Sequence, residues 1–216
     1  EYQLEAELEY SFMSSGARSP AYPTIVGSGG NACVLHYIKN EDVLRKGDLV
    51  LVDAGGEYES YAADVTRTFP VSGKFSKAQA ELYALVLEAQ FAAIDQVQPG
   101  NHWNQPHEAA LAVIAAGLVG LGLLKGEVDE VLKTGAYKKY CMHKTGHWLG
   151  LDVHDVGEYQ VGGEWRVFEE GMVTTIEPGI YIAEGCDEAP ARYRGIGVRI
   201  EDNVLVTKNG NEVLTA

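Results

Sequence analysis

Several stretches of the chain carry apolar residues at the intervals typical of an α-helix. The first covers residues 1–15, where Leu4, Leu8 and Phe12 recur every four residues among acidic ones. Ser76 opens a longer apolar stripe that ends before Pro99 and Gly100, so an N-capped amphipathic helix is expected there. Further helices are predicted over residues 105–121 and, in a shorter form, over 128–133. The glycines of the 105–121 segment should weaken it slightly or let another element pack closely.

The rest of the chain is dominated by short apolar runs that are rich in valine, isoleucine and threonine and are separated by glycine and proline. Such runs are typical of β-strands. They predict strands over residues 24–26, 48–53, 63–69, 172–176, 196–201 and 204–207.

The order of these elements indicates a mixed α/β (α+β) domain made of two half-domains of related design. In the first half the strands follow one helix, whereas in the second half they follow two long helices. The first half is therefore one helix short. We expect that the first helix of the domain, and a further domain upstream, belong to the protein but are absent from this chain. The alternative is a domain that is genuinely asymmetric.

Composition narrows the class of protein. Hydrophobic residues make up 46% of the chain, which excludes disorder as its overall state. The most apolar stretch, residues 109–124, is shorter than the roughly 20 residues needed to span a bilayer, so it is interpreted as a buried helix. The chain also opens without the pattern of a secretory signal, and no membrane association is expected.

The net charge argues against nucleic acid as a partner, and the cysteine content indicates the compartment in which the protein works. The 31 acidic and 17 basic residues give a net charge of −14, which repels nucleic acid. The three cysteines, Cys33, Cys141 and Cys186, are odd in number and have no CxxC spacing, so neither a disulfide framework nor a structural zinc site is expected. A reducing compartment, the cytoplasm, fits best.

Four acidic residues stand at the ends of predicted strands. Asp53 closes the run 49–52, and Asp64 opens the run 65–69, so a hairpin between them could bring the two carboxylates side by side. Two such aspartates repel each other unless a cation or proton lies between them. The simpler alternative places one aspartate in a turn and pairs the other with Arg67.

The second half of the chain repeats this arrangement. Glu177 follows residues 173–176, and Glu201 follows 196–200. Burying such acids at strand ends would be costly without a cation.

Histidines cluster in one segment. His143, His147 and His154 fall within 12 residues that are otherwise rich in glycine and apolar residues, which suggests a site that backbone approaches closely. Together with the four acids, an imidazole from this segment forms an oxygen-rich set with enough donors for two bridged divalent ions. The set comprises Asp53, Asp64, His147, Glu177 and Glu201. Manganese is expected first, then cobalt, zinc or iron, and two such ions would reduce the net charge to about −10.

Five motifs in order resemble the catalytic domain of bacterial aminopeptidase P, the Xaa-Pro aminopeptidases, over nearly the whole chain. They are residues 53–58 (DAGGEY), 64–71 (DVTRTFPV), 146–157 (GHWLGLDVHDVG), 177–181 (EPGIY) and 193–202 (YRGIGVRIED). The resemblance implies the pita-bread fold, in which two pseudo-symmetric half-domains enclose a dinuclear metal centre. It also implies an upstream domain and a homo-oligomeric parent protein.

The resemblance further implies a role for each site residue. Asp53 would chelate one ion, Asp64 and Glu201 would bridge the two, and His147 and Glu177 would complete the second. A metal-bridging hydroxide would attack the peptide bond while Glu177 carries the proton to the leaving nitrogen. Around the centre, His154 would hydrogen-bond the substrate carbonyl, His143 and His36 would stand beside it, and Arg199 would shape the site. A histidine packed in a loop is the alternative for His36.

The implied activity is removal of the N-terminal residue from peptides with proline in the second position. An Xaa-Pro bond is a tertiary amide without an N–H, so a site that does not need that donor can select it. Three alternatives remain open: a prolidase acting on Xaa-Pro dipeptides, a methionine aminopeptidase with the same order of ligands, and a metal-free binding module. Lys144 and Thr145 depart from the small or apolar residues of the family pattern.

Overall fold

The computed structural model describes residues 1–216, and its elements fall into two halves. The first half contains α1 (Tyr2–Ser14), β1 (Ser19–Pro20), β2 (Ile25–Ser28), the 3₁₀ helix η1 (Gly29–Cys33), β3 (Leu49–Ala54), β4 (Gly56–Tyr58), β5 (Tyr61–Ala62) and β6 (Val65–Pro70). The second half opens with α2 (Lys77–Ile94), α3 (Gln105–Gly120), α4 (Val128–Thr134), η2 (Ala136–Lys139), β7 (Gln160–Val161) and β8 (Glu164–Trp165). It closes with β9 (Val173–Ile176), β10 (Gly179–Ile182), η3 (Ala191–Tyr193), β11 (Ile196–Arg199), β12 (Asp202–Thr207) and β13 (Gly210–Val213).

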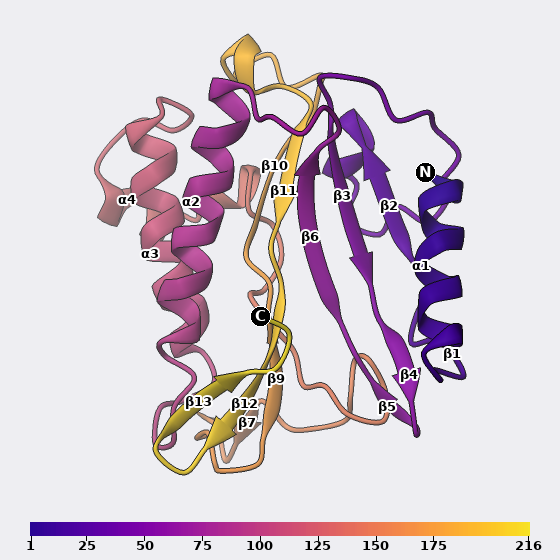
Figure 1. Ribbon diagram of the computed structural model, residues 1–216. Coiled ribbons are helices and arrows are strands. Elements are labelled where there is room, and N and C mark those ends of the chain that lie inside the picture. Colours follow the sequence, from indigo (N-terminus) through magenta and orange to yellow (C-terminus); the bar gives the residue numbers. More distant parts are fainter.

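Each half contributes an antiparallel three-stranded sheet, in the orders β2-β3-β6 and β13-β12-β9, and β10 pairs with β11. The halves meet where β6 runs beside the junction of β11 and β12. There the Glu201 N–H donates to the Thr66 carbonyl over 3.0 Å, and the Thr68 hydroxyl donates to the Arg199 carbonyl over 2.9 Å. Strands from both halves therefore form the centre of the molecule (Figure 1).

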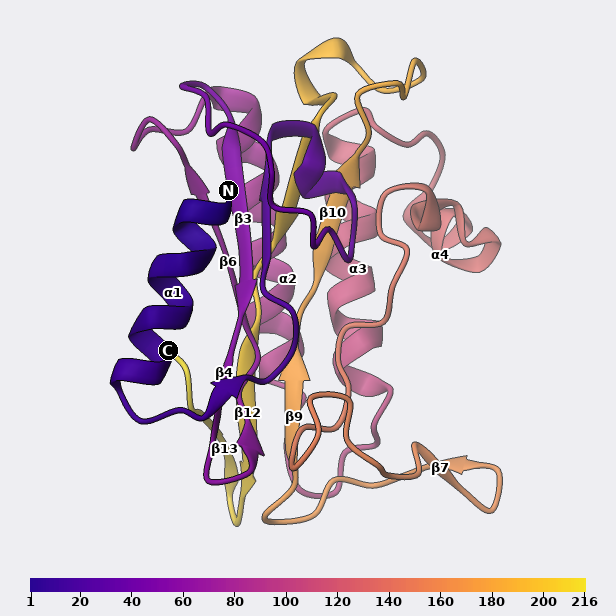
Figure 2. The same ribbon diagram turned by 90° about the vertical axis from the view of Figure 1, so that its right-hand side faces the viewer.

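Helices cover the strands unequally in the two halves. In the second half α2 and α3 pack side by side, and their apolar faces join β9–β12 in the main core of 28 residues. In the first half α1 alone sets Leu4, Leu8 and Phe12 against β2 and β3 (Figure 2). The two halves therefore share the arrangement of helix and antiparallel sheet, and α1 is the helix of the first half.

The predicted helices are confirmed, down to local details. Ser76 caps α2 through a capping box with Gln79. A Cβ atom on Gly117 would lie 2.2 Å from Leu85 Cδ1, so this glycine does let α2 approach α3 closely. None of the helices is both long enough and apolar enough to cross a membrane.

The strand prediction was incomplete at the end of the chain. No strand was predicted between residues 176 and 196, but β10 begins at Gly179 and pairs with β11 in the register Gly179↔Arg199 to Ile182↔Ile196. The predicted strand 196–201 ends at Arg199, which leaves Glu201 at the break before β12. The short β10 is stabilised by a partner later in the chain, which a local pattern does not reveal.

Candidate metal centre and active site

The first two carboxylates lie on neighbouring strands, as the predicted hairpin requires. Asp53 is in β3 opposite Thr66 of β6, and Asp64 directly precedes β6. The Tyr22 hydroxyl reaches both, 2.6 Å from Asp53 Oδ1 and 2.7 Å from Asp64 Oδ1. A Cβ atom on Gly55 would lie 1.8 Å from the Ala63 carbonyl oxygen, so only glycine allows the backbones to come this close.

The histidine segment is held against β9 by backbone hydrogen bonds. Thr175 donates to the His147 carbonyl over 3.0 Å, and Glu177 donates to the Thr145 carbonyl over 2.8 Å. This pairing turns His147 Nε2 toward the acids, 3.3 Å from Asp64 Oδ2 and 3.7 Å from Glu177 Oε1. Two segments that are far from Asp64 in the sequence thus meet it at one place.

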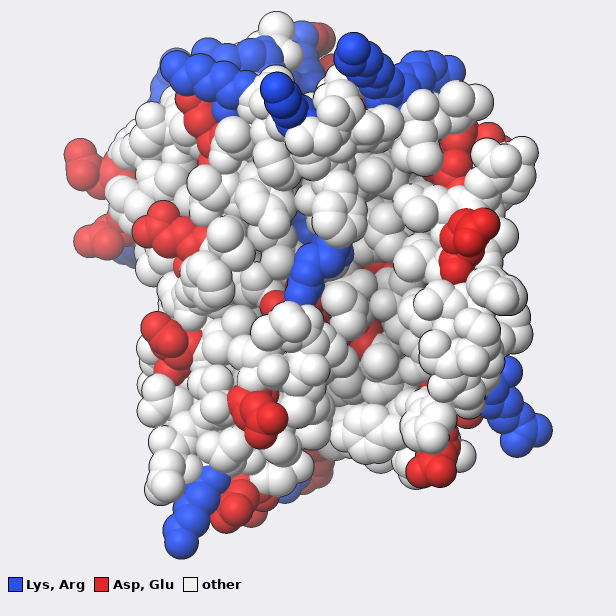
Figure 3. Space-filling model, viewed as in Figure 1, with Lys and Arg blue, Asp and Glu red and all other residues white.

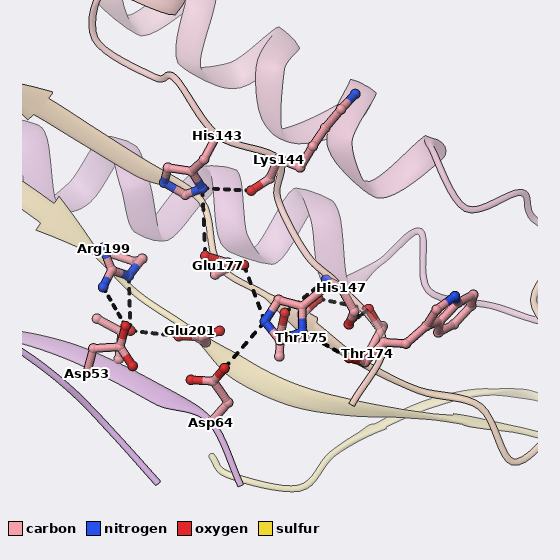
Figure 4. Close-up of polar contacts among 12 residues, drawn as sticks. Asp53, Asp64, His143, Lys144, His147, Thr174, Thr175, Glu177, Arg199 and Glu201 are labelled. Atoms are coloured by element: carbon pink, nitrogen blue, oxygen red, sulfur yellow. Dashed lines mark hydrogen bonds and ion pairs between the residues drawn. The ribbon is translucent and has the colours of Figure 1, made fainter. Parts of the chain in front are cut away.

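Glu201 and Arg199 complete the cluster from the junction of β11 and β12. The Thr66 hydroxyl donates to Glu201 Oε2 over 2.6 Å. Arg199 donates from Nη2 to Asp53 Oδ2 over 2.6 Å and from Nη1 to the Tyr181 hydroxyl over 3.0 Å. Figure 4 shows these side chains converging from both halves of the fold.

All nine site residues predicted from the sequence line one cavity of about 400 Å³. Its wall is completed by Leu35, Lys144, Gly146 and Tyr159. His154 lies beside His147, with ring centroids 4.4 Å apart, and His143 Nε2 is 2.8 Å from the Tyr181 hydroxyl. Figure 3 shows the hollow at the middle of one face, with acidic atoms visible inside it. The alternative in which Arg67 pairs with one of these two aspartates is wrong, because Arg67 pairs with Asp202 over 2.6 Å.

The electrostatics of the cluster favour uptake of positive charge. Burial raises the pKa of Glu177 to about 7 and the pKa of Glu201 well above its usual value, and neighbouring carboxylates add to both shifts. The pKa of Asp53 is also raised, by burial first, although Arg199 opposes the change. Burial lowers the pKa of His147, but Asp64 and Glu177 outweigh it and the net pKa is raised. Acids packed this way bind protons or a cation.

The donor set fits a divalent metal. Asp64, His147 and Glu201 each offer a ligand atom, and these atoms lie within 4.8 Å of one another. Glu177 stands beside His147, and Tyr22 links Asp53 to Asp64, so the other two predicted ligands border this group. Carboxylate oxygens with one imidazole suit a hard or borderline divalent ion such as manganese.

Sequence reasoning missed the hydroxyl groups that hold these side chains in place. Tyr22, Thr66 and Tyr181 hydrogen-bond Asp53, Glu201 and Arg199, respectively. Thr66 carried a usable signal, because residues two apart in a strand share a face and Thr66 follows Asp64 by two. Tyr22 and Tyr181 carried none.

A group of four carboxylates and a histidine at the wall of a cavity suits the divalent-metal chemistry that metal-dependent hydrolases use. The model of metallopeptidase family M24 matches residues 1–208, and the chain belongs to this family.

Curated relatives match the whole chain. It is 53% identical over 216 residues to an Xaa-Pro aminopeptidase of Haemophilus influenzae, covering 100% of this chain and 50% of the relative. The corresponding values for the Escherichia coli Xaa-Pro aminopeptidase are 52%, 100% and 48%. The chain thus spans about half the length of the curated relatives it matches.

Solved structures agree with these matches. Pseudomonas aeruginosa aminopeptidase PepP superposes with a TM-score of 0.98 at 60% identity, over 99% of this chain and 48% of that one. E. coli aminopeptidase P with the inhibitor Pro-Leu gives 0.97 at 51% identity, over 100% and 49%. A zinc-substituted E. coli aminopeptidase P in complex with product gives 0.96 at 51% identity, over the same shares. The pita-bread fold expected from the sequence is confirmed.

Proposed function

We propose that the protein to which this chain belongs is a metal-dependent aminopeptidase that removes the N-terminal residue from peptides with proline in the second position. The observation that carries the proposal is the convergence of all five predicted ligands on one cavity. The similarity of the whole chain to Xaa-Pro aminopeptidases, one of them solved with Pro-Leu, supports the substrate class.

The proposed metal site uses Asp53, Asp64, His147, Glu177 and Glu201 to hold two divalent cations. We propose manganese as the first choice and cobalt, zinc or iron as alternatives, because the donors are mainly oxygen. Cations held there would polarise the scissile carbonyl and lower the pKa of a water molecule. Arg199 would keep Asp53 ionised and oriented through its 2.6 Å contact.

The remaining residues would bind the peptide and move its protons. The Glu177 carboxylate would accept a proton from the attacking water and return it to the proline nitrogen as that bond breaks. His154, beside His147 in the cavity wall, would donate a hydrogen bond to the substrate carbonyl oxygen. His143 and His36, which also line the cavity, would stand beside the peptide.

Two features of the cavity would select proline: the wall needs no N–H from the substrate amide, and part of its lining is apolar. A tertiary amide presents no N–H, so a wall that needs no such donor accepts it. The apolar part of the lining comes from Leu35 and Tyr159, which we propose contact the proline ring.

We also propose that a helix upstream of Glu1 covers an apolar groove of about 520 Å³ beside α1. The groove is lined by residues that include Phe12, Val52, Val65 and Phe69. Its second-half counterpart, the sheet of β9 and β12, is covered by two helices, whereas α1 stands alone (Figure 1). Amide hydrogen exchange in β6 should be slower in the complete natural protein than in residues 1–216 alone. Equal exchange in β6 would refute the proposal that an upstream helix covers the groove.

Cytoplasmic location and homo-oligomeric assembly are further proposals for the complete protein.

The test of the proposed function is a panel of three peptides: an Xaa-Pro-Yaa tripeptide, an Xaa-Pro dipeptide and an Xaa-Ala-Yaa control. Each is assayed with manganese and with a chelator for release of the N-terminal residue. Manganese-dependent cleavage that favours the proline tripeptide supports the proposal. Preference for the dipeptide would identify a prolidase instead, and metal binding without any cleavage by the complete protein would favour a binding module.

A further inference from the structure

The loop that carries His36 has almost no backbone structure of its own. Residues 34–44 lie in no helix or strand, and no backbone N–H of residues 35–44 donates to another backbone carbonyl. His36 lines the catalytic cavity, yet its ring makes no hydrogen bond within the chain. Its position therefore depends on whatever anchors the rest of the loop.

The main anchor is the carboxylate of Glu1, which is 4% exposed. Its Oε1 accepts hydrogen bonds from Ser28 N over 2.8 Å and Asn31 Nδ2 over 3.1 Å. Its Oε2 accepts from the Tyr37 hydroxyl over 2.9 Å and Asp42 N over 2.7 Å. Although Glu1 holds the N-cap position of α1, its side chain does not cap that helix. All four of its bonds go to the end of β2 and to the segment that surrounds His36.

A second anchor holds the loop to β2. Asn40 is fully buried, accepts from Val26 N over 3.0 Å and donates to the Thr24 carbonyl over 2.8 Å. Asn40 thus attaches the far side of the loop to the sheet. The carboxylate of Glu1 accepts the hydrogen bond of the Tyr37 hydroxyl, and the Tyr37 ring lies in a buried cluster with Ile25 and Leu51. Tyr37 is the direct neighbour of His36 in the chain.

We propose that Glu1 is a positioning residue that sets His36 at the wall of the catalytic cavity through Tyr37 and Asp42. A buried carboxylate with four donors is a strong and directional clamp, because hydrogen bonds to a charged acceptor are about twice as strong as neutral ones. The inference rests on the proposed function, in which His36 faces the peptide.

The test is a double-mutant cycle in the complete natural protein, numbered as here. Glu1→Gln keeps the size of the side chain but turns an NH₂ group toward two of the four donors. It should lower kcat/KM for the Xaa-Pro-Yaa tripeptide roughly tenfold while the metal content stays constant. In a His36→Ala background the same change should cost less than twofold. Glu7→Gln, an equal change of charge on the exposed side of α1, is the matched control and should have no effect. Equal losses from Glu1→Gln in both backgrounds would overturn the proposal.

Trypsin provides a readout that does not need activity. Lys39 is exposed within the loop, so Glu1→Gln should increase the rate of cleavage after Lys39 several-fold, and Glu7→Gln should not. Tyr37→Phe removes one donor only and should give an intermediate rate, which keeps the test decisive if Glu1→Gln does not fold. Unchanged cleavage in the folded variants would refute the anchoring. If the wild type cleaves no peptide, the proposed function fails, and the proteolysis still decides whether Glu1 holds the loop.

Discussion

Replacement of Gly146 by alanine should damage both stability and the metal site, because this glycine sits where two segments touch. Gly146 immediately precedes His147, and its two neighbours accept backbone hydrogen bonds from Thr175 of β9 and from Glu177, which directly follows β9. A Cβ atom at Gly146 would lie 2.1 Å from the Thr175 carbonyl oxygen. Since carbon and oxygen do not approach within about 3 Å without bonding, the two segments must separate by roughly 1 Å.

The size of the effect follows from that displacement. Overpacking of this kind costs roughly 2–3 kcal/mol in the free energy of unfolding, which for a domain of this length lowers Tm by about 5–10 °C. The shift also moves His147, whose Nε2 now lies 3.3 Å from Asp64 Oδ2. Misplacing a reacting or ligating group by about 1 Å reduces turnover on the order of 100-fold.

The assay compares Gly146→Ala with Gly120→Ala by urea unfolding, manganese titration and tripeptide cleavage. Gly120 ends α3, and a Cβ atom there would meet nothing within 4 Å. Its replacement should leave activity intact and raise stability by up to about 1 kcal/mol. A Gly146→Ala variant with the stability, manganese affinity and turnover of the wild type would show that the reasoning from backbone contact is wrong.

Three further predictions concern buried polar groups. Burial lowers the pKa of His107 to about 4, so the unfolded state, with a pKa near 6.5, binds more protons between these values. The contribution of His107 to stability should therefore fall as the pH is lowered from 6.5 to 4, by up to about 1.4 kcal/mol per unit, while the raised pKa of Glu177 acts in the opposite direction. The difference in urea unfolding between the wild type and His107→Gln isolates this contribution, and a difference that does not change with pH would contradict it. Arg199→Met leaves Asp53 buried without its cation and should cost about 3–5 kcal/mol in urea unfolding, whereas a loss under 1 kcal/mol would contradict the importance of this pair. Tyr22→Phe removes the hydroxyl shared by Asp53 and Asp64, so the chelator-treated variant should lose about 1–2 kcal/mol in the free energy of unfolding. Manganese should restore most of this loss. No recovery with manganese would count against a cation between these acids.

The acids of the site were predictable because their signals are local. Asp53 and Glu177 each end an apolar run, and burying a carboxylate there would be costly without a cation, which can be inferred without knowing the fold. The proximity of Asp53 and Asp64 was also predictable, since only a hairpin separates them. The convergence of the two halves on one centre came from the family resemblance and is seen directly only in the structure.

The supporting groups could not be predicted, because their contacts depend on the tertiary fold. Tyr22 bonds acids 31 and 42 residues away, and Tyr181 bonds Arg199 across the β10–β11 pair. Tyrosines at such positions look like ordinary core residues in a sequence. In the sequence Glu1 looks like any acidic residue at the start of a helix, and only the folded structure brings four donors to its carboxylate.

The binding of manganese at the carboxylate cluster tests the central claim most directly. The complete natural protein, freed of metal with a chelator, is dialysed against manganese and its metal content is measured beside that of Glu201→Ala. We predict two ions per chain in the wild type and fewer than one in the variant, because Glu201 provides a ligand atom within the group formed with Asp64 and His147. Wild-type protein that retains no manganese, or a variant that retains as much as the wild type, would contradict the assignment of the site.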